Sequence, residues 1–183
     1  LTSMGPPLGG YPRKLERLVS APVLDLGTPG MTAAEAAQRV PEVIACRPQA
    51  VVLELGGNDY IQGADAKGVR ANLEAMIAGF REAGAEVVLV EIPRGLVRDP
   101  FFGLERRLGR QYDLELVPDT PARWLVLRSP AAPPGSWLGG PYLSDDGLHP
   151  NARGNELLAR YVARALENLY GSSVTIRPCA SKE

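Results

Sequence analysis

The sequence predicts an α/β fold built on an open, mostly parallel β-sheet. Short segments rich in Val and Leu alternate along the chain with longer segments whose apolar residues recur at helical spacing, which is typical of such sheets. Residues 50–55 and 86–92 are almost continuously apolar, as expected of strands that helices cover on both faces. The chain has 183 residues, 45% of them hydrophobic, which is enough for one core. We expect a single domain over residues 1–171 and a C-terminal tail over residues 172–183.

The first half of the chain predicts two strands with a helix between them. Residues 21–26 (APVLDL) are a short Val- and Leu-rich run that ends in the turn cluster at 27–30, which predicts a strand followed by a tight loop. Thr32 and Glu35 have the spacing of a capping box, so a helix should begin at Met31 or Thr32. The next strand is predicted over residues 50–55, and the polar sequence GGND follows it at residues 56–59.

The same alternation continues through the middle of the chain. Apolar residues at helical spacing over 69–80, with Gly84 at the position of a C-cap, predict an amphipathic helix ahead of the strand at 86–92. A helix over 102–112 and a weaker strand over 114–117 come next.

A long excursion separates these elements from the last helix. Residues 118–150 carry seven prolines and both tryptophans, which predicts a surface loop with at most a short strand at 124–127. Beyond it, one apolar stripe predicts a helix over 152–170.

The composition excludes several classes of protein. Twenty Lys and Arg against 21 Asp and Glu give a net charge of −1, so nothing argues for binding to nucleic acid or to an anionic membrane. No apolar run reaches the roughly 18 residues that a membrane helix needs, so no transmembrane segment is expected. Cys46 and Cys179 are too few and too far apart to suggest a disulfide scaffold or a CxxC metal site, and we interpret both as small apolar or incidental residues.

The compartment stays open at this point. No export signal is visible, but the chain starts at Leu1 rather than Met, so an upstream segment could carry one. Cytoplasmic, periplasmic and secreted locations therefore remain possible, and the sequence sets no oligomeric state.

Three polar loops should meet at one edge of the sheet. Ligands of open α/β sheets bind in the crevice outside the carboxyl ends of the strands. The loops expected there are residues 27–31, residues 56–60 and the approach to His149, which is the only histidine of the chain.

Asp146 and His149 form the densest candidate for chemistry. A turn at Gly147 can bring the carboxylate back onto Nδ1 of the imidazole, which fixes its tautomer and leaves Nε2 free to act as a general base. The alternative is that Asp146 only helps to cap the next helix and that His149 is a bystander.

Asn58 and Gly30 could stabilise a developing oxyanion. The side-chain amide of Asn58 is a donor at the end of a buried strand, and removal of such donors costs roughly 2.7–4 kcal/mol of transition-state stabilisation. Gly30 can present its backbone N–H ahead of the capped helix. The alternatives are an Asn-Asp turn that merely leaves the strand and a turn glycine that needs a positive φ.

Together these loops resemble the sequence blocks of the SGNH hydrolases, also called GDSL esterases and lipases. The resemblance is carried by Val51–Asp59 (VVLELGGND), Asp145–Asn151 (DDGLHPN) and the loop that contains Gly30, and it covers about residues 1–170. Within this family the chain most resembles the bacterial arylesterase, thioesterase and lysophospholipase branch. The resemblance implies a three-layer α/β/α, flavodoxin-like fold.

The resemblance also implies the reaction. It implies a serine esterase that forms an acyl-enzyme from small carboxylic esters or thioesters of acyl, aryl or lysophospholipid type, with no cofactor or metal. His149 is then the catalytic base, Asp146 its orienting acid, and Gly30 and Asn58 are the oxyanion donors. The long excursion before the last helix either lines an acyl or aryl pocket or is an ordinary packed loop.

One block of the family is missing from the chain. The nucleophilic serine of the family lies in a GDS block at the end of the first strand, and Leu1, Thr2 and Ser3 resemble the residues that come directly after this block in family members. The nucleophile is therefore expected immediately before Leu1. Three interpretations compete: the chain is a fragment, it is a catalytically inactive relative that keeps the binding crevice, or another serine has taken over. Ser3 is near the right place but is not expected to substitute, and Ser136 and Ser144 sit in no strand-to-helix elbow.

The missing block would also remove a central strand. In the family's fold this strand lies between the strands expected here at 21–26 and 51–56, so its absence would leave backbone hydrogen-bonding groups unpaired. Residues 174–176 could pair into the gap, although their polar flanks argue against it.

Two other classes of function compete with the hydrolase. Asp59, Asp146 and His149 could hold a divalent ion for metal-assisted hydrolysis, but no HExxH or multi-His cluster accompanies them. A binding or scaffold protein with an unused crevice is the other alternative.

Overall fold

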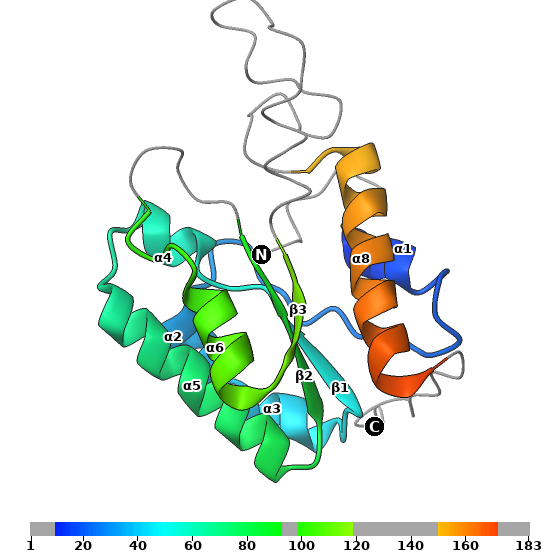
Figure 1. Ribbon diagram of the computed structural model, residues 1–183, viewed down its shortest axis with the longest axis horizontal. Helices are drawn as coiled ribbons and strands as arrows, with labels where there is room; N and C mark the ends of the chain where they lie inside the picture. The colour runs from blue at the N-terminus through cyan, green and yellow to red at the C-terminus, as the bar shows by residue number, and fades with distance from the viewer. Residues whose placement is uncertain (1–9, 93–98, 119–149, 172–183) are drawn as a thin grey trace, which may run out of the picture.

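Three parallel strands form the sheet of the computed structural model, which describes residues 10–92, 99–118 and 150–171 (Figure 1). The strands are β1 (Ala50–Leu53), β2 (Glu86–Val90) and β3 (Glu115–Val117), and they lie in the order β1-β2-β3. The described helices are α1 (Tyr11–Leu15), α2 (Ala33–Gln38), α3 (Val40–Ala45), α4 (Gly57–Ile61), α5 (Ala66–Glu82), α6 (Leu104–Tyr112) and α8 (Ala152–Tyr170).

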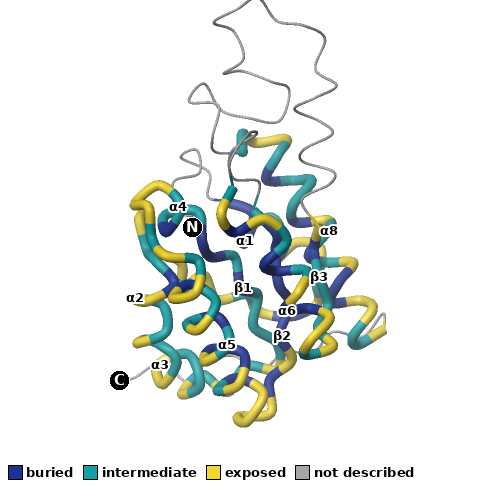
Figure 2. The backbone as a smooth tube through the Cα atoms, turned by 60° about the vertical axis from the view of Figure 1, so that its left-hand side comes forward, coloured by how far each residue is buried: buried dark blue, intermediate teal, exposed yellow. Residues whose placement is uncertain are grey.

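Helices cover both faces of this sheet, which confirms the predicted three-layer α/β/α fold. Val87 and Leu89 of β2 point into a core shared with α2, α5 and α6, whereas Val88 and Val90 point into a second core shared with α1 and α8. Figure 2 shows the buried residues gathered along the strands and the inward faces of the long helices. This two-sided cover explains why β2 is apolar at every position after Glu86.

Most predicted elements are present close to their predicted bounds. The helix predicted over 69–80 is the central part of α5, and its apolar stripe is buried: Val69, Leu73, Met76, Ile77 and Phe80. The capping box is also confirmed, because the Thr32 hydroxyl accepts the Glu35 N–H at 3.3 Å and the Glu35 carboxylate accepts the Thr32 N–H at 2.8 Å. Local sequence signals therefore fix where these helices begin.

Three helical features differ from the prediction. The helix expected after Thr32 is divided into α2 and α3 at Arg39. Pro41 lies in the first turn of α3, where its missing N–H costs no helical hydrogen bond. In a continuous helix its ring would clash with the carbonyl group four residues earlier, so the helix is divided here. The short helix α4 was expected as a loop, and no element was predicted where α1 lies, because five residues are too few to show helical periodicity.

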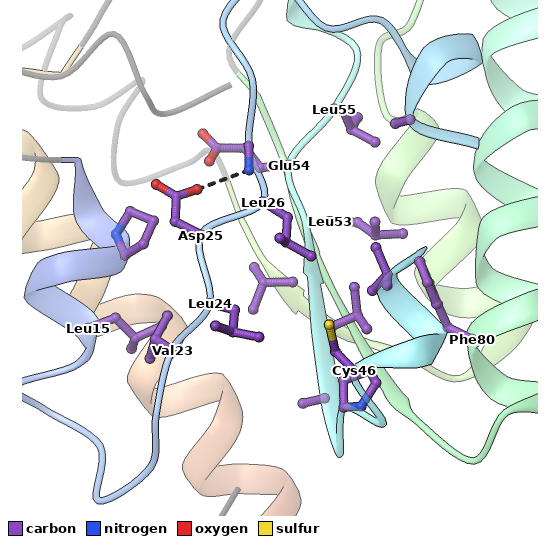
Figure 3. A pocket seen from close by; sticks show the side chains of 18 of the residues that line it. Leu15, Val23, Leu24, Asp25, Leu26, Cys46, Leu53, Glu54, Leu55 and Phe80 are labelled. Carbon is purple, nitrogen blue, oxygen red and sulfur yellow. Dashed lines mark hydrogen bonds between the residues drawn. The ribbon is translucent and has the colours of Figure 1, made fainter. Parts of the chain in front are cut away.

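Residues 21–26 do not form the predicted strand. The segment is extended, but a strand is defined by its hydrogen-bonded partner, and an open slot lies between this segment and β1 (Figure 3). The slot lies where the resemblance places a further strand. It also explains why three of the four residues of β1 are only partly buried, whereas β2 is buried from Val87 to Val90.

The interpretation of Cys46 as an incidental residue was wrong. Cys46 is disulfide-bonded, and its partner lies outside the described residues. Separation along the sequence therefore did not exclude a disulfide here. In the described part of the chain no helix is both long and apolar enough to cross a membrane. The expected strand at 124–127, the excursion over 119–149 and the tail from residue 172 lie outside the described residues.

Candidate functional site

The predicted GGND loop is a tight strand-to-helix turn. Gly56 has φ 110° and ψ −11°, a left-handed conformation that favours glycine, and it allows the chain to leave β1 and enter α4 at once. Asn58 and Asp59 therefore lie in the first turn of a helix at the carboxyl end of the sheet. This is the edge at which ligands of open α/β sheets bind.

Gly30 lies in the turn that leads into α2. Its φ is 78°, and the turn is closed by the Met31 N–H, which the Thr28 carbonyl accepts at 3.2 Å. A Cβ atom added to Gly30 would meet no other atom within 4 Å, so glycine is required here for its backbone conformation and not for space.

Two hydrogen bonds join these turns, so the structure brings Gly30 and Asn58 into one neighbourhood. Nδ2 of Asn58 donates to the Met31 carbonyl at 3.2 Å, and the backbone N–H of Ala33 donates to both carboxylate oxygens of Asp59, at 3.1 and 3.0 Å. Asp59 is only 2% exposed, and it places its negative charge at the N-terminus of α2. The sequence suggested Asp59 only as a possible metal ligand. Its loop was expected to converge with residues 27–31, and this could have indicated a hydrogen bond between Asp59 and the start of the next helix.

The third predicted loop is described only from Pro150 onward. His149, Asp146, Ser144, Ser136 and Ser3 lie outside the described residues. Metal-assisted hydrolysis through Asp59, Asp146 and His149 therefore stays a hypothesis. Within the part of the chain that the structure describes, no three His, Cys, Asp or Glu residues are grouped so that they could hold a metal ion.

The chain directly after His149 is held firmly at the start of α8. The side chain of Asn151 caps this helix and accepts the N–H groups of Arg153 and Gly154 at 2.9 and 3.1 Å. Nδ2 of Asn155 donates to the Pro150 carbonyl at 2.8 Å, and Asn155 is 2% exposed. Sequence reasoning missed Asn155, although an Asn on the apolar stripe of a helix is itself a signal of a buried polar contact.

A buried carboxylic acid lies at the carboxyl end of β1. Oε2 of Glu54 is buried without a hydrogen-bond partner among the described residues. Burial raises the pKa of Glu54 to about 7, and the neighbouring charge of Asp25 also acts to raise it (Figure 3). Burial, followed by the charges of Glu54 and Asp25, also raises the pKa of Tyr11 well above its ordinary value.

Comparisons with known proteins agree with this arrangement. Residues 2–157 match the GDSL-like Lipase/Acylhydrolase family. The chain is similar to an arylesterase of Vibrio mimicus, with 28% identity over 158 residues that cover 83% of this chain and 73% of the relative. It is also similar to thioesterase 1/protease 1/lysophospholipase L1 of Escherichia coli K12, with 25% identity over 153 residues, 80% of this chain and 68% of the relative.

A solved structure shares the fold. The crystal structure of the psychrotrophic esterase EstA from Pseudoalteromonas sp. matches with a TM-score of 0.69 at 19% identity and covers 87% of this chain and 87% of that chain. The family match spans most of the chain, and the names of the two relatives include arylesterase, thioesterase and lysophospholipase. The chain therefore belongs to the GDSL-like lipase/acylhydrolase family and is an ester hydrolase by that membership.

Proposed function

We propose that this protein hydrolyses small carboxylic esters or thioesters, of acyl, aryl or lysophospholipid type, through an acyl-enzyme formed on a serine. The names of the two relatives, an arylesterase and a thioesterase/lysophospholipase, support this substrate range. The observation that carries the proposal is the pair of hydrogen bonds that holds the Gly30 turn against the turn of Asn58 and Asp59. An oxyanion site needs such fixed donors from separate loops.

In the proposed mechanism the serine Oγ attacks the carbonyl carbon of the substrate while His149 takes the hydroxyl proton. Asp146 orients the imidazole and stabilises its protonated form. The tetrahedral intermediate collapses, the bond to the leaving oxygen or sulfur breaks, and His149 returns the proton to that atom. Water then attacks the acyl-serine, again with His149 as base, and releases the carboxylic acid.

Gly30 and Asn58 are the proposed oxyanion donors. Nδ2 of Asn58 carries two hydrogens, and the described contacts use one of them on the Met31 carbonyl, so the other can donate to the substrate oxygen. Gly30 contributes its backbone N–H. Neither donor would need to reorganise during the reaction, which is why such groups lower the barrier efficiently.

The proposal places the nucleophilic serine immediately before Leu1. Among the described residues the only serine is Ser20, and it stands at the start of the extended segment, not at the end of a strand. The competing proposal is an inactive relative that uses the same crevice only for binding.

A fluorophosphonate probe tests the proposal on the chain extended upstream by a strand that ends in Gly-Asp-Ser. We expect the extended protein to be labelled on that serine, and the H149A variant and a Gly-Asp-Ala extension to remain unlabelled. The N58A variant should lose about 10²–10³-fold in kcat, whereas Q62A, an exposed change at the end of the same short helix, should not. A folded, extended protein without labelling would overturn the proposal and favour the binding protein.

A further inference from the structure

The turn that carries the proposed oxyanion donor Gly30 is open to solvent. Residues 27–30 are all exposed, so packing into a core does not hold them. Pro29 and Gly30 are the residues that a type II turn favours at its second and third positions, and Gly30 has the positive φ, 78°, that the third position requires. The Gly30 N–H belongs to the central peptide of this turn. Its direction therefore depends on how the two ends of the turn, Thr28 and Met31, are fixed.

Side chains from other segments hold both ends of the turn. Asn58 holds one end through the Met31 carbonyl, as described above. At the other end, Nη1 of Arg39 donates to the Leu26 carbonyl at 2.9 Å and to Oγ1 of Thr28 at 3.3 Å. These two contacts of Arg39 reach back over 13 and 11 residues of sequence. Arg39 therefore does for the start of the turn what Asn58 does for its end.

Glu42 fixes the plane of the Arg39 guanidinium. Nε and Nη2 of Arg39 donate to the two carboxylate oxygens of Glu42 at 2.9 and 3.0 Å, and such a paired contact sets the orientation of both groups. Nη1 is left for the turn. The two side chains are 31% and 55% exposed, and an ion pair this open to water adds little to the stability of a fold. Its effect is therefore expected on the geometry of the turn.

Arg39 stands at the point where the helix after the turn ends. The first residue of α2, Ala33, is held by Asp59, and Arg39 is the residue that divides α2 from α3. The chain thus leaves Leu26, passes through the turn and α2, and returns to Leu26 through the Arg39 side chain. Any movement of the turn relative to α2 would break the hydrogen bonds of Arg39.

We infer that Arg39, oriented by Glu42, is a positioning residue that aims the Gly30 N–H at the oxyanion of the substrate. The inference rests on the proposed function, because Gly30 acts as a donor only in that reaction. No described residue accepts the Gly30 N–H, which leaves this group for the substrate. A donor stabilises the transition state best when its direction is fixed beforehand. Loss of Arg39 should therefore weaken binding of the transition state and leave binding of the ester unaltered.

Steady-state hydrolysis of p-nitrophenyl butyrate by the upstream-extended protein provides the first test. In the R39A variant kcat should fall about 10–100-fold while KM stays within about twofold, because the donor is misplaced but still present. R39K should lose about as much as R39A, since a single ammonium group cannot make a paired contact with Glu42 and also bond the turn. The matched control is R70A, which removes an ion pair of similar exposure between Arg70 and Glu74 on α5. Its kcat should stay within about twofold of the original value.

A double variant tests whether Glu42 acts through Arg39. E42A alone frees the guanidinium and should lower kcat by about threefold, in the same direction as R39A. Added to R39A, it should cause no further loss, because the side chain that Glu42 orients is already gone. Independent losses that multiply in the double variant would overturn the inference.

The order parameter of the Gly30 N–H, from nitrogen-15 relaxation of the extended protein, gives a test that needs no catalysis. We expect about 0.85 in the original chain and in R70A, and a value below about 0.6 in R39A. A Gly30 N–H that keeps its order parameter and its chemical shift in R39A would contradict the inference, and so would equal losses of kcat in R39A and R70A. A protein that shows this loss of order but has no esterase activity would contradict the proposed function alone.

Discussion

Both carboxylate oxygens of Asp59 accept the backbone N–H of Ala33, across 26 residues of sequence. This contact fastens the turn at the carboxyl end of β1 to the first residue of α2. Ala33 is fully buried and Asp59 almost so, which means that water cannot replace either partner. The position of Gly30 relative to Asn58 therefore depends on a side chain that has no part in the proposed reaction.

Replacement of Asp59 by alanine should destabilise the fold by about 1.5–3 kcal/mol, because a buried N–H loses a charged acceptor. The D59N variant keeps one carbonyl oxygen as acceptor and should lose less. Urea denaturation of the two variants measures this difference in the free energy of unfolding. A D59A protein whose stability stays within about 0.5 kcal/mol of the original chain would contradict the assigned role of this bond.

Asn155 should matter for both stability and the proposed catalysis. The N155L variant keeps much of the side-chain volume but leaves the Pro150 carbonyl without its donor, so we expect a loss of about 1–3 kcal/mol. In the extended, active chain kcat should fall with little change in KM, because Pro150 is the next residue after His149. N168L is the matched control, since Asn168 lies exposed on the same helix. Equal effects of the two changes on kcat would argue against a positioning role for Asn155.

The stability of the protein should fall as the pH rises from about 4.5 to about 7. The pKa of Glu54 is raised from its ordinary value of 4.5 to about 7 in the fold, so the folded state binds this proton more tightly than the unfolded state. The stabilisation is complete below pH 4.5 and is lost as the pH rises through 7. The E54Q variant should flatten the curve of unfolding free energy against pH in this window. E82Q, an exposed change on α5, should leave that curve unaltered.

Two glycines should respond to alanine in opposite directions. Gly30 has a positive φ, so G30A should cost about 1–2 kcal/mol even though the space around it is empty. Gly68 lies within α5, where an added Cβ would make an ordinary contact at 3.9 Å with the Asp65 carboxylate. G68A should therefore stabilise the protein by about 0.5–1 kcal/mol. Thermal unfolding of both variants measures these two changes in stability. A stabilising G30A substitution would show that the turn does not need a residue with a positive φ at position 30.

The sequence predicted those elements whose signal is local. The apolar runs that became β1 and β2 and the stripe of α5 needed no knowledge of their neighbours, and neither did the cap formed by Thr32 and Glu35. The short helix α4 was hidden because Gly56 and Gly57 are typical of loops, and only the left-handed φ of Gly56 shows how the turn forms.

The features that sequence could not predict all depend on distant contacts. Residues 21–26 have the pattern of a strand, but whether they form one depends on the segment that lies beside them. Three contacts could be predicted only by knowing which segments meet in space. They are the hydrogen bond that Asp59 accepts, the burial of Glu54 Oε2 without a partner among the described residues, and the hydrogen bond from Asn155 to the Pro150 carbonyl. The proposed roles of His149 and Asp146 stay predictions, because neither residue lies among those that the structure describes.

The slot also divides the molecule into parts that differ in how they can open. The β1-β2-β3 ladder and α5 and α6 form one continuous packed unit, while α1 packs chiefly on α8, where Lys14 lies 3.8 Å from Glu156. No described strand pairing bridges the two sides of the slot. Residues 10–27 are held to the rest of the described chain by the side-chain core that α1 shares with α8 and β2, and by the Arg39 guanidinium, which donates to the Leu26 carbonyl at 2.9 Å. We therefore expect faster amide exchange in this part of the molecule than in the ladder.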